Sequence, residues 1–284
     1  MFSEDREAIR FAILDLNEGH PNQGMKSINQ VVKRWSVDKN VKIVYDVFDV
    51  RLKNELPDMS YDVYISSGGP GSPLNTRFED WDIAWNRWFD EVIRYNENPS
   101  NNQKKFVFLI CHSFQLACRY FNAGLICKRR STSFGVFPVH IMPYGLYDPV
   151  FNNLQNPFYV VDSRDYQLIQ PNHERLHKMG AYITCIEKNR PHVPYERAVM
   201  GIRFSDYIFG TQFHPEADAV GMLKHFQQEE KRETVIKNHG EAKLFSMIEQ
   251  LDDPSKIMLT NHNLIPNFLA LAYSHLGVEA FEEV

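Results

Sequence analysis

Hydrophobic positions in the first half of the chain form short unbroken runs that alternate with segments of helical spacing. The runs lie at residues 10–16, 41–47, 61–66 and 106–110. Short runs of this kind are typical of strands that are buried on both faces of a sheet. Strands that alternate with helices over short connections favour a mostly parallel central sheet flanked by helices. The pattern therefore predicts an α/β fold.

Apolar residues recur at helical spacing in residues 25–35 and 79–95, which predicts two helices that pack on this sheet. The second of them carries three of the four tryptophans, Trp81, Trp85 and Trp88, on one face. A bulky stripe buried in the core is the usual explanation for such a face. A surface that docks a partner is the alternative.

The pattern changes after residue 121 to a series of short segments with strand character. These lie at residues 125–128, 133–142, 157–163, 166–169, 181–187, 197–204 and 207–211. From about residue 217 the apolar spacing becomes helical again. We therefore predict an α/β domain over residues 1–234 and a helical C-terminal extension over residues 235–284. A cut between Thr234 and Val235 is expected to leave the first domain folded and to change its oligomeric state or activity.

Composition excludes several classes of protein. The chain has 284 residues, of which 43% are hydrophobic and 24% charged, as in ordinary globular proteins. A net charge of −5 does not indicate a basic surface that binds nucleic acid. The sequence also has no apolar stretch of 18 residues, the length that a membrane-spanning helix requires. The cysteines have no C-x-x-C spacing, which favours a reducing cytoplasm. They are Cys111, Cys118, Cys127 and Cys185.

Two histidines have the spacing of metal ligands. His173 and His177 would share one face of a helix. A bound zinc requires three or four ligands, and no third candidate is nearby in the sequence. We therefore expect no metal site, and nothing in the sequence indicates a cofactor.

The apolar run at residues 106–110 ends on Cys111, and a helical pattern starts directly after it. A sharp strand-to-helix turn lifts the residue at its tip out of the sheet, which is the geometry of a nucleophile elbow. The start of a helix also favours negative charge, such as that of a thiolate. Cys111 is therefore a candidate nucleophile. A buried and inert cysteine at the end of a strand is the alternative.

Two further stretches could complete a site around Cys111. Residues 207–211 form a short strand, and His214 and Glu216 follow it. A histidine can act as the base for a thiol, and a carboxylate can fix the orientation of its ring. Glycines after the strand at residues 61–66, beginning with Gly68 and Gly69, let backbone N–H groups approach a substrate as an oxyanion hole requires.

The order and spacing of these stretches resemble the class I glutamine amidotransferases, in particular a stand-alone domain like the amidotransferase domain of GMP synthase. Signatures of that family are a GGPG-type loop, a G-x-C-x-G-H-Q elbow and an H-P-E segment, and the resemblance covers about residues 9 to 226. This chain has Gly68-Gly69-Pro70-Gly71, then Leu109-Ile110-Cys111-His112-Ser113-Phe114-Gln115, then His214-Pro215-Glu216. Its elbow departs from the pattern, because Leu109 and Ser113 replace glycines and Phe114 replaces the histidine.

The resemblance implies a flavodoxin-like fold and assigns roles to individual residues. It implies a catalytic triad of Cys111, His214 and Glu216, with the N–H groups of Gly69 and His112 as the oxyanion hole. It implies substrate-binding roles for Gly68, Gln115, Ser163 and Arg164. An ion pair of Arg164 with Asp162 or Asp165 at the surface is the alternative for that arginine.

The activity that the resemblance implies is release of ammonia from the glutamine side chain through a cysteine thioester. Because the sequence has no G-x-x-x-x-G-K-[ST] run, the ammonia acceptor is expected on another chain or is absent. Two alternatives remain open: a hydrolase of another γ-glutamyl compound, and an inactive member with a binding or regulatory role. A synthetase partner chain and a homo-oligomer are both left open, and no nucleic acid or membrane partner is expected.

Overall fold

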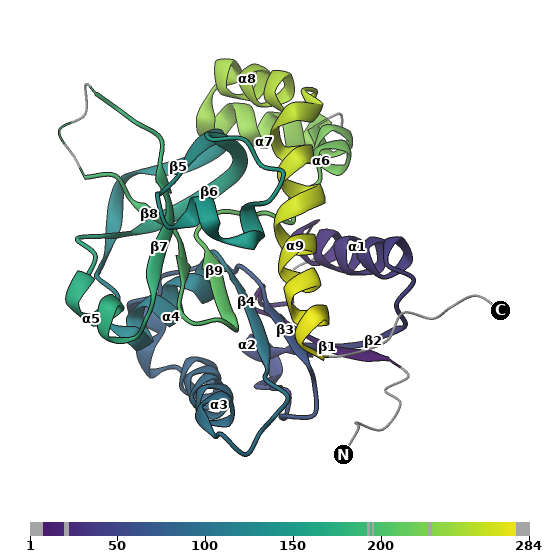
Figure 1. Cartoon of the computed structure of the whole chain (residues 1–284). Helices are drawn as coiled ribbons and strands as arrows, with labels where there is room; N and C mark the ends of the chain where they lie inside the picture. Colours follow the sequence, from purple (N-terminus) through teal and green to yellow (C-terminus); the bar gives the residue numbers. More distant parts are fainter. Residues whose placement is uncertain (1–7, 20–22, 192–193, 195, 227–228, 277–284) are drawn as a thin grey trace.

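The computed structural model describes residues 8–19, 23–191, 194, 196–226 and 229–276. Its strands are β1 (Ile9–Asp15), β2 (Ile43–Asp49), β3 (Val63–Ser66), β4 (Phe106–Ile110), β5 (Leu125–Ile141), β6 (Phe158–Ile169), β7 (Tyr182–Glu187), β8 (Val199–Arg203) and β9 (Ile208–Thr211). Its α-helices are α1 (Gln23–Asp38), α2 (Val50–Lys53), α3 (Asp80–Glu97), α4 (His112–Phe121), α5 (His173–Lys178), α6 (Ala219–Phe226), α7 (Glu229–His239), α8 (Glu241–Leu251) and α9 (Leu259–Leu276). The α/β class predicted from the sequence is confirmed, with helices on both sides of a sheet (Figure 1).

The sheet has the strand order β2-β1-β3-β4-β9-β8-β6-β5-β7. The first five strands in this order, from β2 to β9, are parallel to one another. All remaining pairs are antiparallel, and an additional β7–β8 pairing closes β8, β6, β5 and β7 into a small ring. The prediction of a mostly parallel sheet is therefore wrong for the second half. Among the described residues of that half, no long helix connects successive strands, and a parallel pair requires such a crossover.

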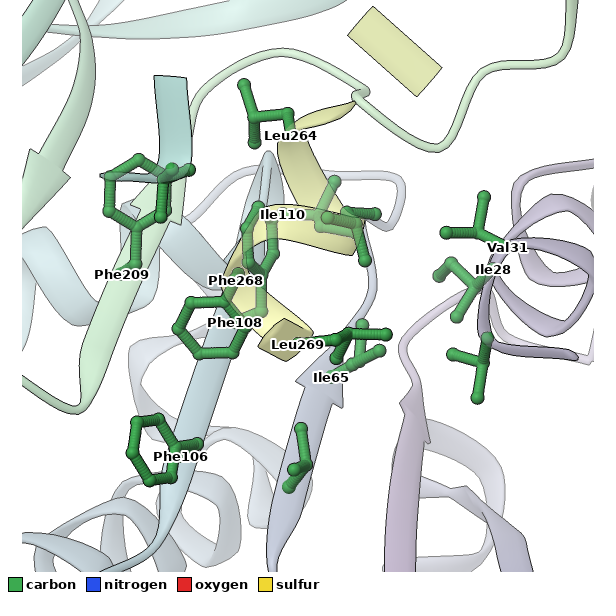
Figure 2. Packing of buried hydrophobic residues seen from close by; sticks show 14 of the residues in the cluster. Ile28, Val31, Ile65, Phe106, Phe108, Ile110, Phe209, Leu264, Phe268 and Leu269 are labelled. Carbon is green, nitrogen blue, oxygen red and sulfur yellow. The ribbon is translucent and has the colours of Figure 1, made fainter. Parts of the chain in front are cut away.

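Alternate residues of the parallel strands feed two separate cores. On one face, Phe106 and Phe108 of β4 belong to a cluster with residues of α1 and α9 (Figure 2). On the other face, Val107 belongs to a cluster with α3 and α4. Trp85 of α3 is fully buried in this second cluster. Trp81 and Trp88, the other two tryptophans of the helix, are almost completely buried in the same cluster. The tryptophan stripe is thus part of the core.

Helix α9 covers the same face of the sheet as α1, and the two helices contact one another (Figure 1). The ring of Phe268 in α9 lies 5.2 Å from that of Phe108 and 6.1 Å from that of Phe106, measured between centroids. The division at residues 234 and 235 remains a proposal. Because the C-terminal segment completes one face of the core, this packing argues against a folded protein after a cut at that point.

Leu109 fits at the end of β4 because a glycine faces it on the next strand. Leu109 is fully buried and pairs with Gly210 of β9. A Cβ atom at Gly210 would lie 2.8 Å from Cδ2 of Phe114 and 3.3 Å from Cβ of Leu109. The two bulky residues that depart from the family pattern, Leu109 and Phe114, therefore pack over this glycine.

We expect Gly210→Ala to lower the free energy of unfolding by about 1–3 kcal/mol, because the added methyl group overpacks a filled core. Urea denaturation measures this effect. In a Phe114→Leu background the same substitution should cost less, since the nearest clashing atom is removed. Equal costs in the two backgrounds would contradict the packing described for Leu109 and Phe114.

Candidate active site

Cys111 occupies a strained turn between β4 and α4. Its φ and ψ angles are 49° and −96°, a region that residues other than glycine rarely adopt. The Cys111 N–H donates to the Thr211 carbonyl at 2.8 Å, and the Cys111 carbonyl accepts from the Gln115 N–H at 3.0 Å. The cysteine therefore sits at the tip of a strand-to-helix elbow, with the start of α4 directly beneath it.

Ser113 fastens this elbow to the sheet. Its hydroxyl donates to the Ser66 carbonyl at 2.7 Å and accepts from the Ile110 N–H at 2.9 Å. Ser66 ends β3, and Ile110 ends β4. A residue that departs from the family pattern thus supplies hydrogen bonds that a glycine could not make.

The glycine loop after β3 lies directly against the elbow. A Cβ atom on Gly68 would lie 2.8 Å from Cε1 of His214 and 3.4 Å from Cβ of Cys111. A Cβ atom on Gly69 would lie 2.3 Å from the Leu16 carbonyl oxygen. Only glycine fits at these two positions, so the sequence lets the loop backbone approach both side chains closely.

His214 and Glu216 follow β9 and lie beside Cys111. Nδ1 of His214 donates to Oε1 of Glu216 at 2.7 Å, while the His214 N–H donates to the Val161 carbonyl at 2.9 Å. Burial alone would lower the pKa of His214, but the Glu216 carboxylate and the Cys111 sulfur raise it well above its ordinary value. The arrangement favours the imidazolium form of His214 next to the Cys111 sulfur.

The C-terminal helix supports Glu216, which the sequence did not indicate. Asn261 of α9 donates from Nδ2 to the Glu216 carbonyl at 2.9 Å. Arg34 of α1 in turn donates to the carbonyl and the side-chain oxygen of Asn261, both at 2.9 Å. Asn261 lies 45 positions from Glu216 in the sequence, and Arg34 lies 227 positions from Asn261. No local motif could therefore have revealed the connection.

Gln115 and Gln212 line the other side of the elbow. Nε2 of Gln115 donates to Oε1 of Gln212 at 3.1 Å, and Nε2 of Gln212 points at the Cys111 sulfur at 3.7 Å. Gln115 was singled out from the sequence, whereas Gln212 was missed. Gln212 is fully buried, so its amide has a fixed place next to the nucleophile.

Ser163 and Arg164, the two neighbouring residues with implied substrate-binding roles, have different surroundings in the structure. The exposed Ser163 faces Cys111 through its carbonyl, 3.8 Å from the sulfur. Arg164 is buried and pairs with Asp162 at 2.9 Å and with Glu187 at 3.3 Å. Its guanidinium is thus committed to a buried ion network. This matches the alternative interpretation of an Asp162 pair, except that the pair lies in the interior rather than at the surface.

A buried arginine that the sequence did not indicate joins the glycine loop to the elbow. Arg51 of α2 donates through Nη2 to the Pro70 carbonyl at 2.7 Å and to Nε2 of His112 at 3.2 Å. Its guanidinium also stacks 4.3 Å above the Trp81 ring and pairs with Glu18. Burial, followed by the Arg51 charge, lowers the pKa of His112 to about 3. The His112 ring therefore stays neutral.

All residues predicted for the site line one cavity of about 450 Å³. They are Gly68, Gly69, Cys111, His112, Gln115, Ser163, Arg164, His214 and Glu216. A volume of this size is within the usual range for small-molecule sites. The arrangement of a cysteine, a histidine and a carboxylate beside close backbone N–H groups is suited to nucleophilic attack on an acyl carbon.

Within the described part of the chain, no group of three or more His, Cys, Asp or Glu side chains could hold a metal ion. His173 and His177 lie on α5 and are both exposed.

The described helices include none that is long and apolar enough to cross a membrane.

Comparisons with known proteins identify the family and related folds. A family model described as glutamine amidotransferase class-I matches residues 24–245. A glutamine amidotransferase from Thermotoga maritima aligns with a TM-score of 0.65 at 15% identity, over 94% of this chain and 99% of that chain. A search of curated proteins found no significant match.

Two further solved structures have related folds. A candidate GMP synthase subunit protein from Thermoplasma acidophilum aligns with a TM-score of 0.54 at 14% identity, over 96% of this chain and 98% of that chain. The glutaminase domain of Trypanosoma brucei CTPS with bound acivicin aligns with a TM-score of 0.56 at 15% identity, over 94% of both chains. At 14% and 15% identity, the similarity to these two structures shows the fold alone.

Proposed function

This chain belongs to the class I glutamine amidotransferase family, and from that premise we propose that it hydrolyses the side-chain amide of glutamine or of a γ-glutamyl compound. The observation that carries the proposal is the meeting of Cys111, His214 and Glu216 in one cavity, on segments about 100 residues apart in sequence. Release of glutamate from L-glutamine by the purified chain tests it. No release from glutamine or any γ-glutamyl amide would favour a binding or regulatory member instead.

The proposed mechanism assigns a residue to each step. The Cys111 thiolate attacks the amide carbon, and the N–H groups of Gly69 and His112 stabilise the oxyanion. The imidazolium of His214 gives its proton to the departing nitrogen, so ammonia leaves and a γ-glutamyl thioester remains. Water then attacks the thioester with His214 as base, which releases glutamate and restores the thiolate. Glu216 holds the His214 ring in the required orientation.

The ammonia acceptor belongs to another chain in this proposal. Two of the similar structures are described as a CTPS glutaminase domain and a GMP synthase subunit protein, and these names support a synthetase-type partner. Ammonia production that rises on addition of such a partner would distinguish this role from that of a hydrolase acting alone.

Removal of the Glu216 charge should change the pH dependence of the reaction. The carboxylate raises the pKa of His214, so in Glu216→Gln that pKa should fall. The basic limb of kcat/KM reports loss of the imidazolium proton and should move to lower pH by about 1–3 pH units, the effect of one adjacent charge. A pH–rate profile of both proteins measures this. A basic limb that stays in place would mean that His214 is not the titrating group.

Arg51 should influence turnover without touching the substrate. In Arg51→Met the bridge between Pro70 and His112 is lost, so the two oxyanion donors lose their relative position. We expect kcat to fall by about 10–100-fold with little change in KM, because small misplacements of positioned groups have effects of this size. The exposed Arg94 on α3 provides the control Arg94→Met. Equal kcat values in the two variants would refute a positioning role.

A further inference from the structure

A second cavity adjoins the one that contains Cys111. It has a volume of about 410 Å³ and shares Gly24, His214 and Glu216 with the first. It is bounded by residues of α1, α6 and α7 and of the segment around His214. The catalytic histidine and its carboxylate therefore form part of the wall of both cavities.

Neighbouring positions on two strands connect the cavities. On β5, Thr132 lines the first cavity and Phe134 lines the second. On β6, Ser163 lines the first and Val161 the second. Residues two apart on a regular strand lie on the same face, so β6 presents one continuous surface from Ser163 to Val161, whose carbonyl accepts a hydrogen bond from the His214 N–H.

Most of the surface of the second cavity is apolar, although Gln23, Ser27, Asp218 and Asn238 also line it. Its apolar lining residues are Phe134, Val161, Ala217, Met222, Phe226 and Val235. The rings of Phe134 and His239 are stacked with centroids 4.2 Å apart and form a flat wall. A cavity with this lining stabilises aliphatic or aromatic groups in proportion to the area that they bury.

A carboxylate oxygen in this wall lacks a partner among the described residues. Glu216 is 2% exposed, and its Oε2 accepts no hydrogen bond from them, while Oε1 accepts from His214. Glu216 contacts Nδ1 of His214, whereas the leaving nitrogen is protonated from the ring edge that faces Cys111, so it is the apolar lining that matches an apolar substituent on the amine.

We infer that the second cavity binds the amine portion of a γ-glutamyl amide whose nitrogen carries an apolar alkyl or aryl group. The inference rests on the proposed function and specifies its substrate class. The leaving nitrogen must reach His214 to be protonated, and His214 also lines this second, largely apolar cavity. Glutamine itself has no substituent to fill it.

The chemistry balances without a further reactant. The Cys111 sulfur forms a bond to the amide carbon, the carbon–nitrogen bond breaks, and the His214 proton passes to the nitrogen. The apolar amine leaves neutral, and water cleaves the thioester to glutamate. By microscopic reversibility, the same amine bound there can attack the thioester and reform the amide.

The test compares γ-glutamyl-n-butylamide with L-glutamine, with glutamate release as the measurement. We expect kcat/KM for the butylamide to exceed that for glutamine by about tenfold or more, from burial of four carbons. Preference for glutamine would overturn the inference and leave the proposed function standing. Turnover of neither compound would overturn both.

Two matched variants locate the effect. Val235 lines the second cavity, whereas Val220 on α6 is exposed outside it. Val235→Trp should fill the cavity and lower the ratio of the two kcat/KM values at least tenfold, and Val220→Trp should leave the ratio unchanged. If Val235→Trp does not fold, Met222→Trp fills the same cavity from α6. An unchanged ratio in the folded cavity variant would overturn the inference.

Discussion

Replacement of Cys111 by alanine should lower glutamate release by about 10³-fold or more, because nucleophile and base act as one unit and no other thiol of the described residues borders the cavity. The fold should persist. Alanine adopts the same left-handed backbone at the same cost as cysteine, and the elbow is held by Ser113 and the backbone rather than by the sulfur. Turnover and a thermal melt of the purified variant measure the two effects.

Cys118→Ala is the matched control for this variant. Cys118 lies on the same helix, is fully buried and does not line the cavity. Burial also raises the pKa of its thiol, so it is a poor nucleophile. Turnover in Cys118→Ala should stay within about twofold of the wild type, as expected for a substitution outside the reacting groups. Comparable losses in the two variants would point to a general effect on stability and against a specific role for Cys111.

Phe268→Ala should destabilise the protein by about 3–5 kcal/mol, the usual cost of removing a fully buried phenylalanine. Its ring fills the space between α9 and the phenylalanines of β4 (Figure 2). Phe245 on α8 is 53% exposed and serves as the control. Phe245→Ala should change the free energy of unfolding by no more than about 0.5 kcal/mol. Urea denaturation compares the two, and similar costs would mean that α9 is not part of the core.

The same packing bears on truncation after Thr234. Such a truncation removes α9, uncovers apolar residues of β4 and takes away the Asn261 contact to Glu216. We therefore expect an insoluble product instead of the folded domain that the sequence pattern alone predicts. A soluble truncated protein with glutaminase activity would support the division at residues 234 and 235.

The first half of the fold could be predicted because its signal is local. The inner parallel strands β3, β4 and β9 are buried on both faces and are therefore short apolar runs, as in residues 106–110, whereas the edge strand β2 is partly exposed. The antiparallel half was harder to predict. Residues 125–128 and 133–142 were expected to be separate, because the polar stretch between them breaks the apolar pattern. In the structure they belong to β5, whose pairing with β6 is irregular between Lys128 and Ser133.

The site shows the same division between local and distant information. Cys111, His214 and Glu216 were found because each stands in a short motif whose chemistry can be read from neighbouring residues. Arg51, Asn261 and Gln212 were missed, since each matters through a partner far away in sequence. The fit of Leu109 likewise depends on Gly210, about 100 positions later, and no local rule connects the two.

The C-terminal helices illustrate a third case. Their apolar faces were recognised from the sequence, and such a face must be buried against its own chain or another. The pattern alone gives no preference between these outcomes. For α9, burial of Leu264, Phe268 and Leu269 against the sheet settles the matter.

The most direct test of the account is the rate at which each cysteine reacts with iodoacetamide near neutral pH, followed by mass spectrometry after brief exposure. Cys111 borders the cavity next to a histidine whose pKa is raised, whereas Cys118 and Cys185 are fully buried with raised thiol pKa values. We predict that Cys111 reacts much faster than Cys118, Cys127 or Cys185, and that His214→Ala removes the difference. Equal labelling of all four cysteines in the wild type would contradict an activated nucleophile at Cys111.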